Sequence, residues 1–254
     1  MTPIRRGQSG AANGREQGPA GTLTASASPI ISKLEPYAVK IPARRSQKLA
    51  IPSTVDETLY YVRRGVLLTH AECPAGRGFV LSILYADDVF SPLAMPSLPG
   101  AKLTSAADNT EVWRLRGPAL SKLASSDPAV ERFISRRLAE QSARLALHNV
   151  LVASLEGHER VAALIAELAL RIGTRNGGSI ALDMPLSRME IAGYLALNAD
   201  TVSRIFSRLR SEGVIAKGGH GRIICHDIAA LEKLLPAAVA ADVGSKSGAL
   251  PLTA

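Results

Sequence analysis

The stretch from Ala129 to Glu156 contains neither glycine nor proline, and this feature most constrains the fold that the chain can adopt. Asp127 and Pro128 stand directly before it; Asp is a favoured N-cap residue, and Pro suits the first helical position. The pattern predicts a single helix over 128–156, on the order of 42 Å long at 1.5 Å per residue. Few monomeric domains of this size can cover a helix of that length. Part of its surface is therefore expected to contact another chain.

An apolar stripe with spacings of three and four residues runs along this predicted helix. It predicts the seam of a homodimer, in which the polar stripe residues Gln141 and His148 would fix the register. The alternative is a long helix that lies along its own chain, with Gln141 and His148 at the rim of the contact. The predicted dimer-interface residues are Val130, Ile134, Leu138, Gln141, Leu145, His148, Val152 and Leu155.

The chain before this helix divides into a tail and a strand-rich region. Residues 1–32 are rich in small and polar side chains and are predicted to form a disordered tail. Residues 33–127 contain short apolar segments separated by Gly, Pro and Asp turns, which predict a β-sandwich. Between Phe90 and Ala107 the alternation weakens, and we expect a Pro-rich loop. The segments that predict strands are 59–62, 66–69, 79–84 and 111–116.

Residues 157–235 are predicted to form a domain with the order helix, hairpin, helix, helix, hairpin, followed by a flexible tail over 236–254. Ser187 and Glu190 have the spacing of a capping box, and Asn198 is suited to cap the next helix. The apolar spacing over 191–205 is that of a helix-turn-helix. Ala196 occupies a turn position that is more often Gly, so we expect slight strain there.

Burial of the second helix by its apolar face leaves Asp200, Ser203 and Arg204 together on the opposite side, near the end that enters a major groove. Arg can bind guanine with two hydrogen bonds, Ser can contact a neighbouring base, and Asp can accept from cytosine or hold the Arg. These three are the predicted base-contacting residues. The predicted phosphate contacts are Thr201, Arg208, Arg210, Lys217 and Arg222.

A two-stranded wing is predicted after the second helix, with the glycines of 218–221 forming its turn. His220 either contacts a phosphate or is an exposed residue of this turn without a role in binding, and we favour the second interpretation. A trihelical domain with an ordinary solvated charged face is the alternative to a DNA-binding unit.

The helix-turn-helix with its wing, the segment 156–162 at the end of the long helix and the upstream strands resemble the Crp/Fnr family of bacterial transcription regulators. The segment 200–204 is similar to the Glu-Thr-Val-Ser-Arg segment of the FixK/Fnr-like branch. The resemblance implies an α+β protein: an N-terminal β-sandwich of the cyclic-nucleotide-binding jelly-roll type, a long dimerisation helix and a C-terminal winged helix-turn-helix.

The resemblance also implies a homodimer on an inverted repeat, with a TTGA-like half-site read by Ser203 and Arg204, and RNA polymerase as a further partner. Asp200 stands where the branch has Glu and is one methylene shorter, so the branch's preference at that base is not carried over to this chain. The competing hypothesis is an effector-binding or protein-interaction module whose helix-turn-helix does not contact DNA.

We expect no cofactor in the sensor region. Relatives that bind cyclic AMP carry a Gly-Glu and a later Arg, and 91–107 has neither, although Lys102 keeps one cation there. Cys73 and Cys225, the two cysteines, are too few for an iron-sulfur cluster. His70 and Cys73 could ligate haem or a metal, but the tip of a hairpin explains both more simply. Cys225 is either redox-sensitive or a small core residue, and we favour the core.

Composition narrows the remaining function classes. The net charge of +8 favours an anionic partner. Two distant cysteines argue against a disulfide scaffold, and no apolar stretch reaches the roughly 20 residues of a membrane span. Phosphate loops, nucleophile elbows and clustered metal ligands are absent from the sequence, so we do not expect an enzyme. The chain is expected to be a reduced, cytoplasmic protein that binds double-stranded DNA and no membrane.

Overall fold

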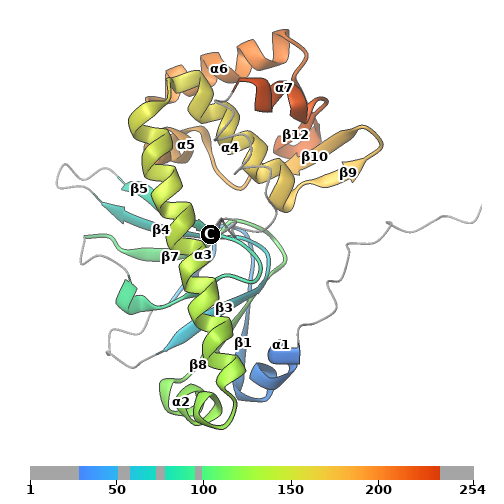
Figure 1. Cartoon of the computed structure of the whole chain (residues 1–254). Coiled ribbons are helices and arrows are strands. Elements are labelled where there is room, and N and C mark those ends of the chain that lie inside the picture. Colours follow the sequence, from blue (N-terminus) through green and yellow to red (C-terminus); the bar gives the residue numbers. More distant parts are fainter. Residues whose placement is uncertain (1–28, 51–57, 73–77, 95–98, 235–254) are drawn as a thin grey trace, which may run out of the picture.

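A computed structural model describes residues 29–50, 58–72, 78–94 and 99–234 of the chain. A β-sandwich, a long helix that runs along it and a C-terminal domain at one end of that helix follow one another in the sequence (Figure 1). Residues 1–28 of the predicted N-terminal tail and the whole predicted tail over 236–254 lie outside the described residues.

The sandwich consists of two four-stranded antiparallel sheets. The first has the order β1-β8-β3-β6, with β1 Ala38–Ala43, β8 Thr110–Leu115, β3 Leu59–Arg64 and β6 Val89–Phe90. The second has the order β2-β7-β4-β5, with β2 Lys48–Leu49, β7 Lys102–Ser105, β4 Leu67–Glu72 and β5 Gly78–Leu84. The predicted sandwich is confirmed.

Two predictions about this region are wrong. The loop expected between Phe90 and Ala107 contains β7, which pairs with both β2 and β4, and a short 3-10 turn, η2 Pro92–Ala94. Residues 29–32, expected to belong to the disordered tail, lie in α1 Pro29–Leu34, which is followed by η1 Glu35–Tyr37. Ile31 and Leu34 are buried because they cover the outer face of the first sheet, where Trp113 is also buried.

Alternation along β8 divides its side chains between two cores. Val112 faces the space between the sheets, whereas Trp113 and Leu115 face outward toward α1 and the long helix. The short helix α2 Gly117–Ser126 then leads to the long helix α3 Pro128–Ser154. The predicted long helix is confirmed, and the Asp127 carboxylate accepts a hydrogen bond of 3.0 Å from the Ala129 amide as its N-cap.

The apolar stripe of α3 faces its own chain along much of its length. Val130 is fully buried beside Trp113, and Ile134 packs partly buried against the same cluster. The Gln141 side-chain amide donates to the Val89 carbonyl at 2.7 Å. Nearer the end of the helix, the His148 ring stacks on Tyr194 with centroids 4.0 Å apart, and burial lowers the pKa of His148.

The assignment of Val130 and Leu155 to the predicted dimer seam is therefore wrong. Val130 is 0% exposed and Leu155 6% exposed within the single chain, so neither can contact a partner. Their apolar surface is already covered, by the sandwich in one case and by the C-terminal domain in the other. Leu138 and Leu145 remain 40% and 43% exposed. One side of α3 therefore lies along its own chain, as the alternative interpretation predicts.

The C-terminal domain begins with α4 Gly157–Ile172 and contains the four-stranded sheet β11-β12-β10-β9. Its order matches the predicted helix, hairpin, helix, helix, hairpin, and a further helix, α7, follows. The remaining elements are β9 Thr174–Asn176, β10 Ser179–Asp183, α5 Arg188–Tyr194, α6 Ala199–Ser211, β11 Ile215–Lys217, η3 Gly219–Gly221, β12 Arg222–Cys225 and α7 Ile228–Lys233.

One continuous hydrophobic cluster joins this domain to the second sheet of the sandwich. Leu68 and Val80 of the sheet belong to the same buried cluster as Ile165 of α4 and Ile191 of α5. The main chain of β5 also lies close to α5: a Cβ added to Gly193 would lie 3.5 Å from the Phe79 Cα. The sandwich and the C-terminal domain thus share a core.

A polar network crosses the same junction. The Tyr85 hydroxyl donates to Glu167 of α4 at 2.9 Å, while Arg144 of α3 donates to Asp88 at 2.5 Å. The Asp88 carboxylate also accepts from the Tyr85 amide at 2.8 Å. Burial raises the pKa of Glu167, and the hydrogen bond from Tyr85 opposes that rise because it stabilises the ionised form.

Replacing Tyr85 by Phe is expected to lower the free energy of unfolding by about 1–3 kcal/mol at pH values above the raised pKa of Glu167, because the ionised carboxylate loses a buried donor. The loss should diminish as the pH falls through the raised pKa of Glu167, since the protonated carboxyl needs that donor less. Urea unfolding at several pH values measures both effects. Tyr37→Phe, at an exposed tyrosine, is the neutral control; equal stability of both variants would contradict the assigned role.

Candidate nucleic-acid interface

The two helices of the helix-turn-helix begin at the residues that the capping signals predict. At α5 the Glu190 amide donates to the Ser187 hydroxyl at 3.2 Å, and the Ser187 amide donates to the Glu190 carboxylate at 2.7 Å. At α6 the Thr201 amide donates to the Asn198 side-chain oxygen at 2.7 Å. The predicted capping box and the predicted N-cap are confirmed, and they set where each helix starts.

Between these helices the chain turns at Ala196, which has a positive φ of 53°. The turn is closed by the Leu197 amide, which donates to the Ala192 carbonyl at 2.9 Å. A left-handed conformation costs a residue with a Cβ on the order of 1 kcal/mol relative to glycine. The strain that the sequence predicts at this position is confirmed.

Ala196→Gly is expected to raise the free energy of unfolding by about 0.5 kcal/mol, because relief of the left-handed strain exceeds the added entropy of the unfolded chain. Ala196 is exposed, so no buried contact is lost. The matched control is Ala139→Gly, at an exposed position inside α3, which should lower stability by about 1 kcal/mol. Urea unfolding of the two variants should therefore give shifts of opposite sign; two shifts of the same sign would rule out strain at Ala196.

The buried face of α6 determines which side chains it presents to a ligand. Val202, Phe206 and Leu209 are buried against the rest of the domain. The predicted base-contacting residues Asp200, Ser203 and Arg204 are all exposed, in the first two turns of the helix. Figure 1 shows α6 at the outer end of the molecule, away from the sandwich.

Arg204 and Asp200 do not form an ion pair, although the sequence allows one at this spacing. The ion pairs found among the described residues include none to Arg204. The Arg204 guanidinium is therefore free for a bidentate contact with an acceptor pair such as guanine O6 and N7.

The predicted phosphate-contacting residues lie around this face, and several have partners in their own chain. Arg208 donates to Glu212 at 2.7 Å, and Arg210 donates to the Ser207 hydroxyl at 2.9 Å. Arg222 forms two hydrogen bonds to the Asp183 carboxylate, at 2.7 and 3.1 Å. These pairs are at the surface, so they cost little to exchange for a phosphate. Lys217 is exposed at the end of β11, and Thr201 is half-buried.

The wing is formed as predicted, by β11 and β12 with η3 between them. Its second strand also pairs with β10, and the Arg222–Asp183 pair joins the same two strands. The wing is thus fixed to the domain through β10. The side chain of His220 lies outside the described set, so neither interpretation of that residue is tested.

Arg188 is a residue of this region that the sequence identifies only as the start of a helix. Its guanidinium lies over the Phe206 ring, 3.3 Å from the ring centroid, and so connects α5 to α6. Burial and the nearby Arg210 lower the pKa of Arg188. The two residues lie on different helices of the helix-turn-helix, and the apolar spacing that predicts this motif does not include Arg188, so only the packing of α5 on α6 reveals the contact.

Of the two possible haem or metal ligands, His70 and Cys73, the structure describes only His70. His70 is buried within β4, where its Nε2 lies 2.7 Å from the Thr104 hydroxyl, rather than at the tip of a hairpin. Cys73 lies outside the described residues. Within the ranges that the structure describes, no group of three His, Cys, Asp or Glu side chains could hold a metal ion.

Cys225 is buried in β12, and burial raises its pKa to about 11. In a Cys73→Ser variant, we expect native Cys225 to react with iodoacetamide at pH 8 at least about a hundredfold more slowly than after unfolding, because its thiolate fraction is reduced. Rapid labelling of the native variant would instead favour a redox-sensitive thiol. Mass spectrometry of timed samples, with and without urea, measures the two rates.

None of the helices in the described residues is both long and apolar enough to span a membrane.

Comparison with known proteins agrees with this geometry. Residues 159–234 match the family model of the Crp-like helix-turn-helix domain. A probable transcriptional activator of Rhizobium leguminosarum bv. viciae is 29% identical over 185 residues, which cover 72% of this chain and 76% of that protein. The nitrogen fixation regulation protein FixK of Azorhizobium caulinodans is 28% identical over 130 residues, covering 51% of this chain and 52% of FixK.

The solved structure of FixK2 from Bradyrhizobium japonicum superposes with a TM-score of 0.66 at 25% identity, and the match covers 78% of this chain and 98% of FixK2. The winged helix-turn-helix, its exposed basic helix and these relatives together define a DNA-binding transcription regulator. Residues 159–234 form a Crp-like helix-turn-helix domain, and the similarity of the chain to FixK and FixK2 supports a regulator of the Crp/Fnr type in the FixK-like branch.

Proposed function

We propose that this regulator acts as a homodimer that reads an inverted repeat with TTGA-like half-sites. The observation that carries the proposal is the cluster of Asp200, Ser203 and Arg204, all exposed on α6 while the opposite face of that helix is buried. An exposed helix whose Arg204 has no ion-pair partner within the described part of the chain suits direct readout in a major groove.

Ser203 and Arg204 are the proposed base contacts of each half-site, with Asp200 at their side. Asp200 is one methylene shorter than a Glu and reaches less far toward cytosine, so the base selected at this position will be the most informative of the half-site. Arg208, Arg210, Lys217 and Arg222 are the proposed phosphate contacts, with Thr201 at the start of the helix.

The proposed dimer seam is narrower than the stripe in the sequence. Leu138, Leu145 and Val152 are spaced by seven residues, so they lie in line on α3. Leu138 and Leu145 are exposed, which supports a second copy of α3 as the group that covers them. The other predicted positions, Ile134, Gln141 and His148, have contacts within their own chain, which makes them the border of the seam.

We further propose that the protein is cytoplasmic, has no enzymatic activity, and regulates transcription by binding DNA and contacting RNA polymerase. The names of its relatives, which are transcription activators and regulators, support this proposal.

Selection of bound sequences from a random DNA library tests the proposal. We expect an enriched inverted repeat whose half-site centres are separated by about one helical turn, roughly 34 Å. Enrichment of a single half-site would contradict the dimer. Absence of any enriched sequence would favour the alternative of a protein-interaction module that does not contact DNA.

A further inference from the structure

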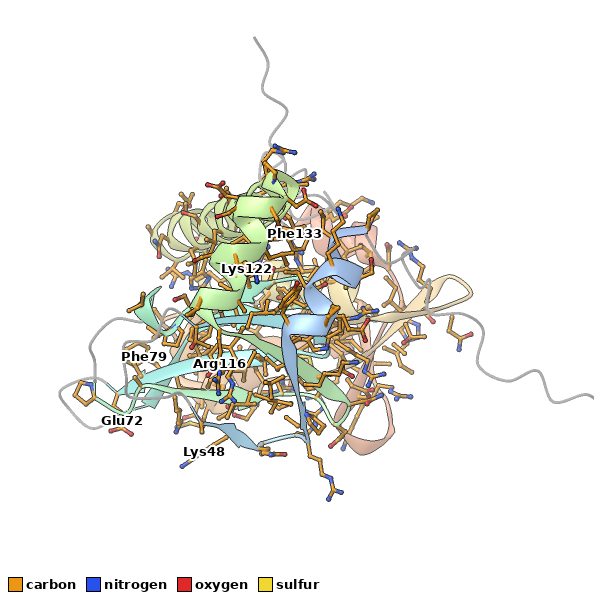
Figure 2. All side chains as sticks on the ribbon, turned by 90° about the horizontal axis from the view of Figure 1, so that it is seen from below. Lys48, Glu72, Phe79, Arg116, Lys122 and Phe133 are labelled. Atoms are coloured by element: carbon orange, nitrogen blue, oxygen red, sulfur yellow. The ribbon has the colours of Figure 1, made fainter. Side chains whose placement is uncertain are left out.

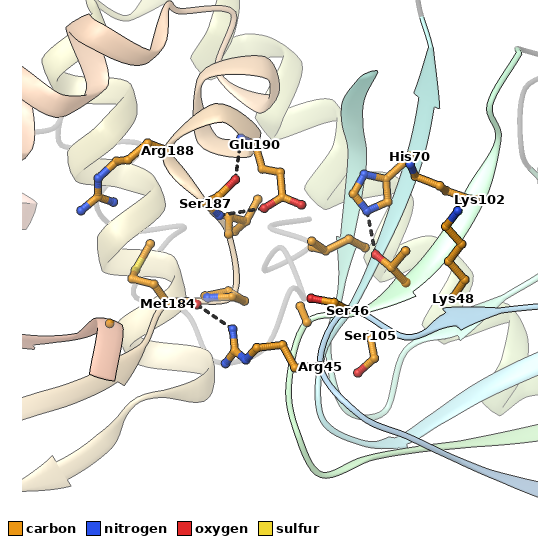
Figure 3. Close-up of a pocket in the computed structure, with 16 residues that line it drawn as sticks. Arg45, Ser46, Lys48, His70, Lys102, Ser105, Met184, Ser187, Arg188 and Glu190 are labelled. Carbon is orange, nitrogen blue, oxygen red and sulfur yellow. Dashed lines mark hydrogen bonds between the residues drawn. The ribbon is translucent and has the colours of Figure 1, made fainter. Parts of the chain in front are cut away.

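A cavity of about 650 Å³ lies between the sandwich and the start of α5 (Figure 3). Its volume is in the range of small-molecule binding pockets, roughly 300–1,000 Å³. The cavity is on the outer face of the second sheet, outside the space between the two sheets. Its sandwich wall carries Arg45, Lys48, Leu68, His70, Lys102 and Thr104, and its other wall carries Met184, Pro185, Leu186, Ser187, Arg188 and Glu190.

Strand register explains why the sandwich wall is basic. Leu103 and Ser105 of β7 are buried, so Lys102 and Thr104 point to the opposite, outer face. Thr104 is paired with Lys48 of β2, and Lys102 with His70 of β4. The two lysines therefore stand on adjacent strands, whose spacing is about 4.8 Å, and project from the same side of the sheet.

The positive charge of the cavity is poorly compensated. No ion pair among the described residues involves Lys48 or Lys102. Four of the lining residues are Lys or Arg, of which Arg45 pairs with Asp108 at 3.6 Å, whereas Glu190 alone of the lining is acidic. Glu190 is already engaged, because one of its carboxylate oxygens accepts from the Ser187 amide.

The second wall supplies different chemistry. Its lining here is apolar: Met184 is partly exposed, and Pro185, Leu186 and, on the sandwich side, Leu68 are buried beside it. Arg45 connects the two walls, since it donates to the Met184 carbonyl at 3.1 Å. The cavity thus has a cationic side and an apolar side, as a ligand with a phosphate and an organic body requires.

We propose that this cavity binds a small phosphorylated molecule, whose phosphate contacts Lys48, Lys102 and the Thr104 hydroxyl while its organic part lies against Met184 and Leu186. A ligand in this position touches both the sandwich and the DNA-binding domain, so it favours the present arrangement of the two. If the proposed DNA-binding function holds, linkage requires that the ligand and the operator change each other's affinity by the same factor.

Direct binding to the full-length protein, without DNA, tests the site independently of the proposed function. The probe is inorganic pyrophosphate, titrated by calorimetry at constant ionic strength. The Lys48→Gln and Lys102→Gln substitutions should each weaken pyrophosphate binding about tenfold or more, because each removes a charge-assisted hydrogen bond. The matched control is Lys122→Gln on α2; Figure 2 shows Lys122 and Lys48 on opposite sides of the sandwich.

A second measurement locates the probe. In NMR spectra of the wild-type protein, added pyrophosphate should shift the backbone amide resonances of β7 and those of residues 184–190 together, because both segments line the cavity. Equal weakening by all three substitutions, or shifts confined to other surfaces, would mean non-specific attraction to a basic protein and would overturn the proposal. So would the absence of measurable pyrophosphate binding.

Discussion

Replacing Leu145 by Arg is expected to convert the proposed homodimer to a monomer and to weaken binding to an inverted repeat by at least about a hundredfold. Leu145 is exposed in the single chain, so the monomer tolerates Arg, whereas an unpaired guanidinium inside a helix–helix seam is costly. A monomer also loses the gain in affinity that comes from engaging two linked half-sites, on the order of 10² or more. Light scattering measures the mass, and fluorescence anisotropy measures DNA affinity.

Val150 provides the matched control for this experiment. It is 54% exposed on the same helix but lies five residues from Leu145, which places it about 140° around the helix axis. Val150→Arg should therefore stay dimeric and keep its affinity for the inverted repeat. A dimeric Leu145→Arg variant with unchanged DNA binding would place the dimer contact on another surface.

Replacing Arg204 by Ala is expected to cost about 1–3 kcal/mol of binding free energy in each half-site and to remove discrimination at one base pair. The expectation follows from the geometry of α6, where the Arg204 side chain is exposed and, among the described residues, has no ion-pair partner. A dimer carries the substitution twice, so the loss on a full operator exceeds the loss on a half-site. Anisotropy titrations with the selected operator and its single-base variants measure the discrimination.

Arg208→Ala is the matched comparison, because this exposed residue lies one turn further along the same helix and is assigned to phosphate contact. It should weaken binding to all DNA sequences alike and lower the salt dependence of the affinity. If both variants lose the same affinity for operator and scrambled DNA, the assignment of Arg204 to base contact is wrong.

Elements with local signals could be predicted from the sequence. The long helix, the capping box at Ser187, the N-cap at Asn198 and the strained turn at Ala196 each depend on a few neighbouring residues, and all four are present in the structure. Helix caps and periodicity are local properties, so a single sequence contains what is needed to place them.

Elements that depend on distant partners were missed. The strand β7 has a short, weak pattern, and it forms because β2 and β4 supply hydrogen bonds on both sides. Helix α1 is stabilised by Ile31 and Leu34 against the outer face of the first sheet, a contact that composition cannot reveal. The sequence also leaves open which surface covers the apolar stripe of α3, because periodicity does not distinguish burial of Val130 in its own chain from burial against a second chain.

The shared cluster of Leu68, Val80, Ile165 and Ile191 has a consequence for how the molecule unfolds. Because the DNA-binding domain and the sandwich bury apolar surface against each other, neither can lose its structure without exposing part of the other's interior. Melting of the two parts is therefore coupled, and a fragment starting at Gly157 would present Ile165 and Ile191 without their sandwich neighbours. Destabilising substitutions in the sensor region will accordingly reduce the amount of folded DNA reader in the cell, even where they leave its contact residues unchanged.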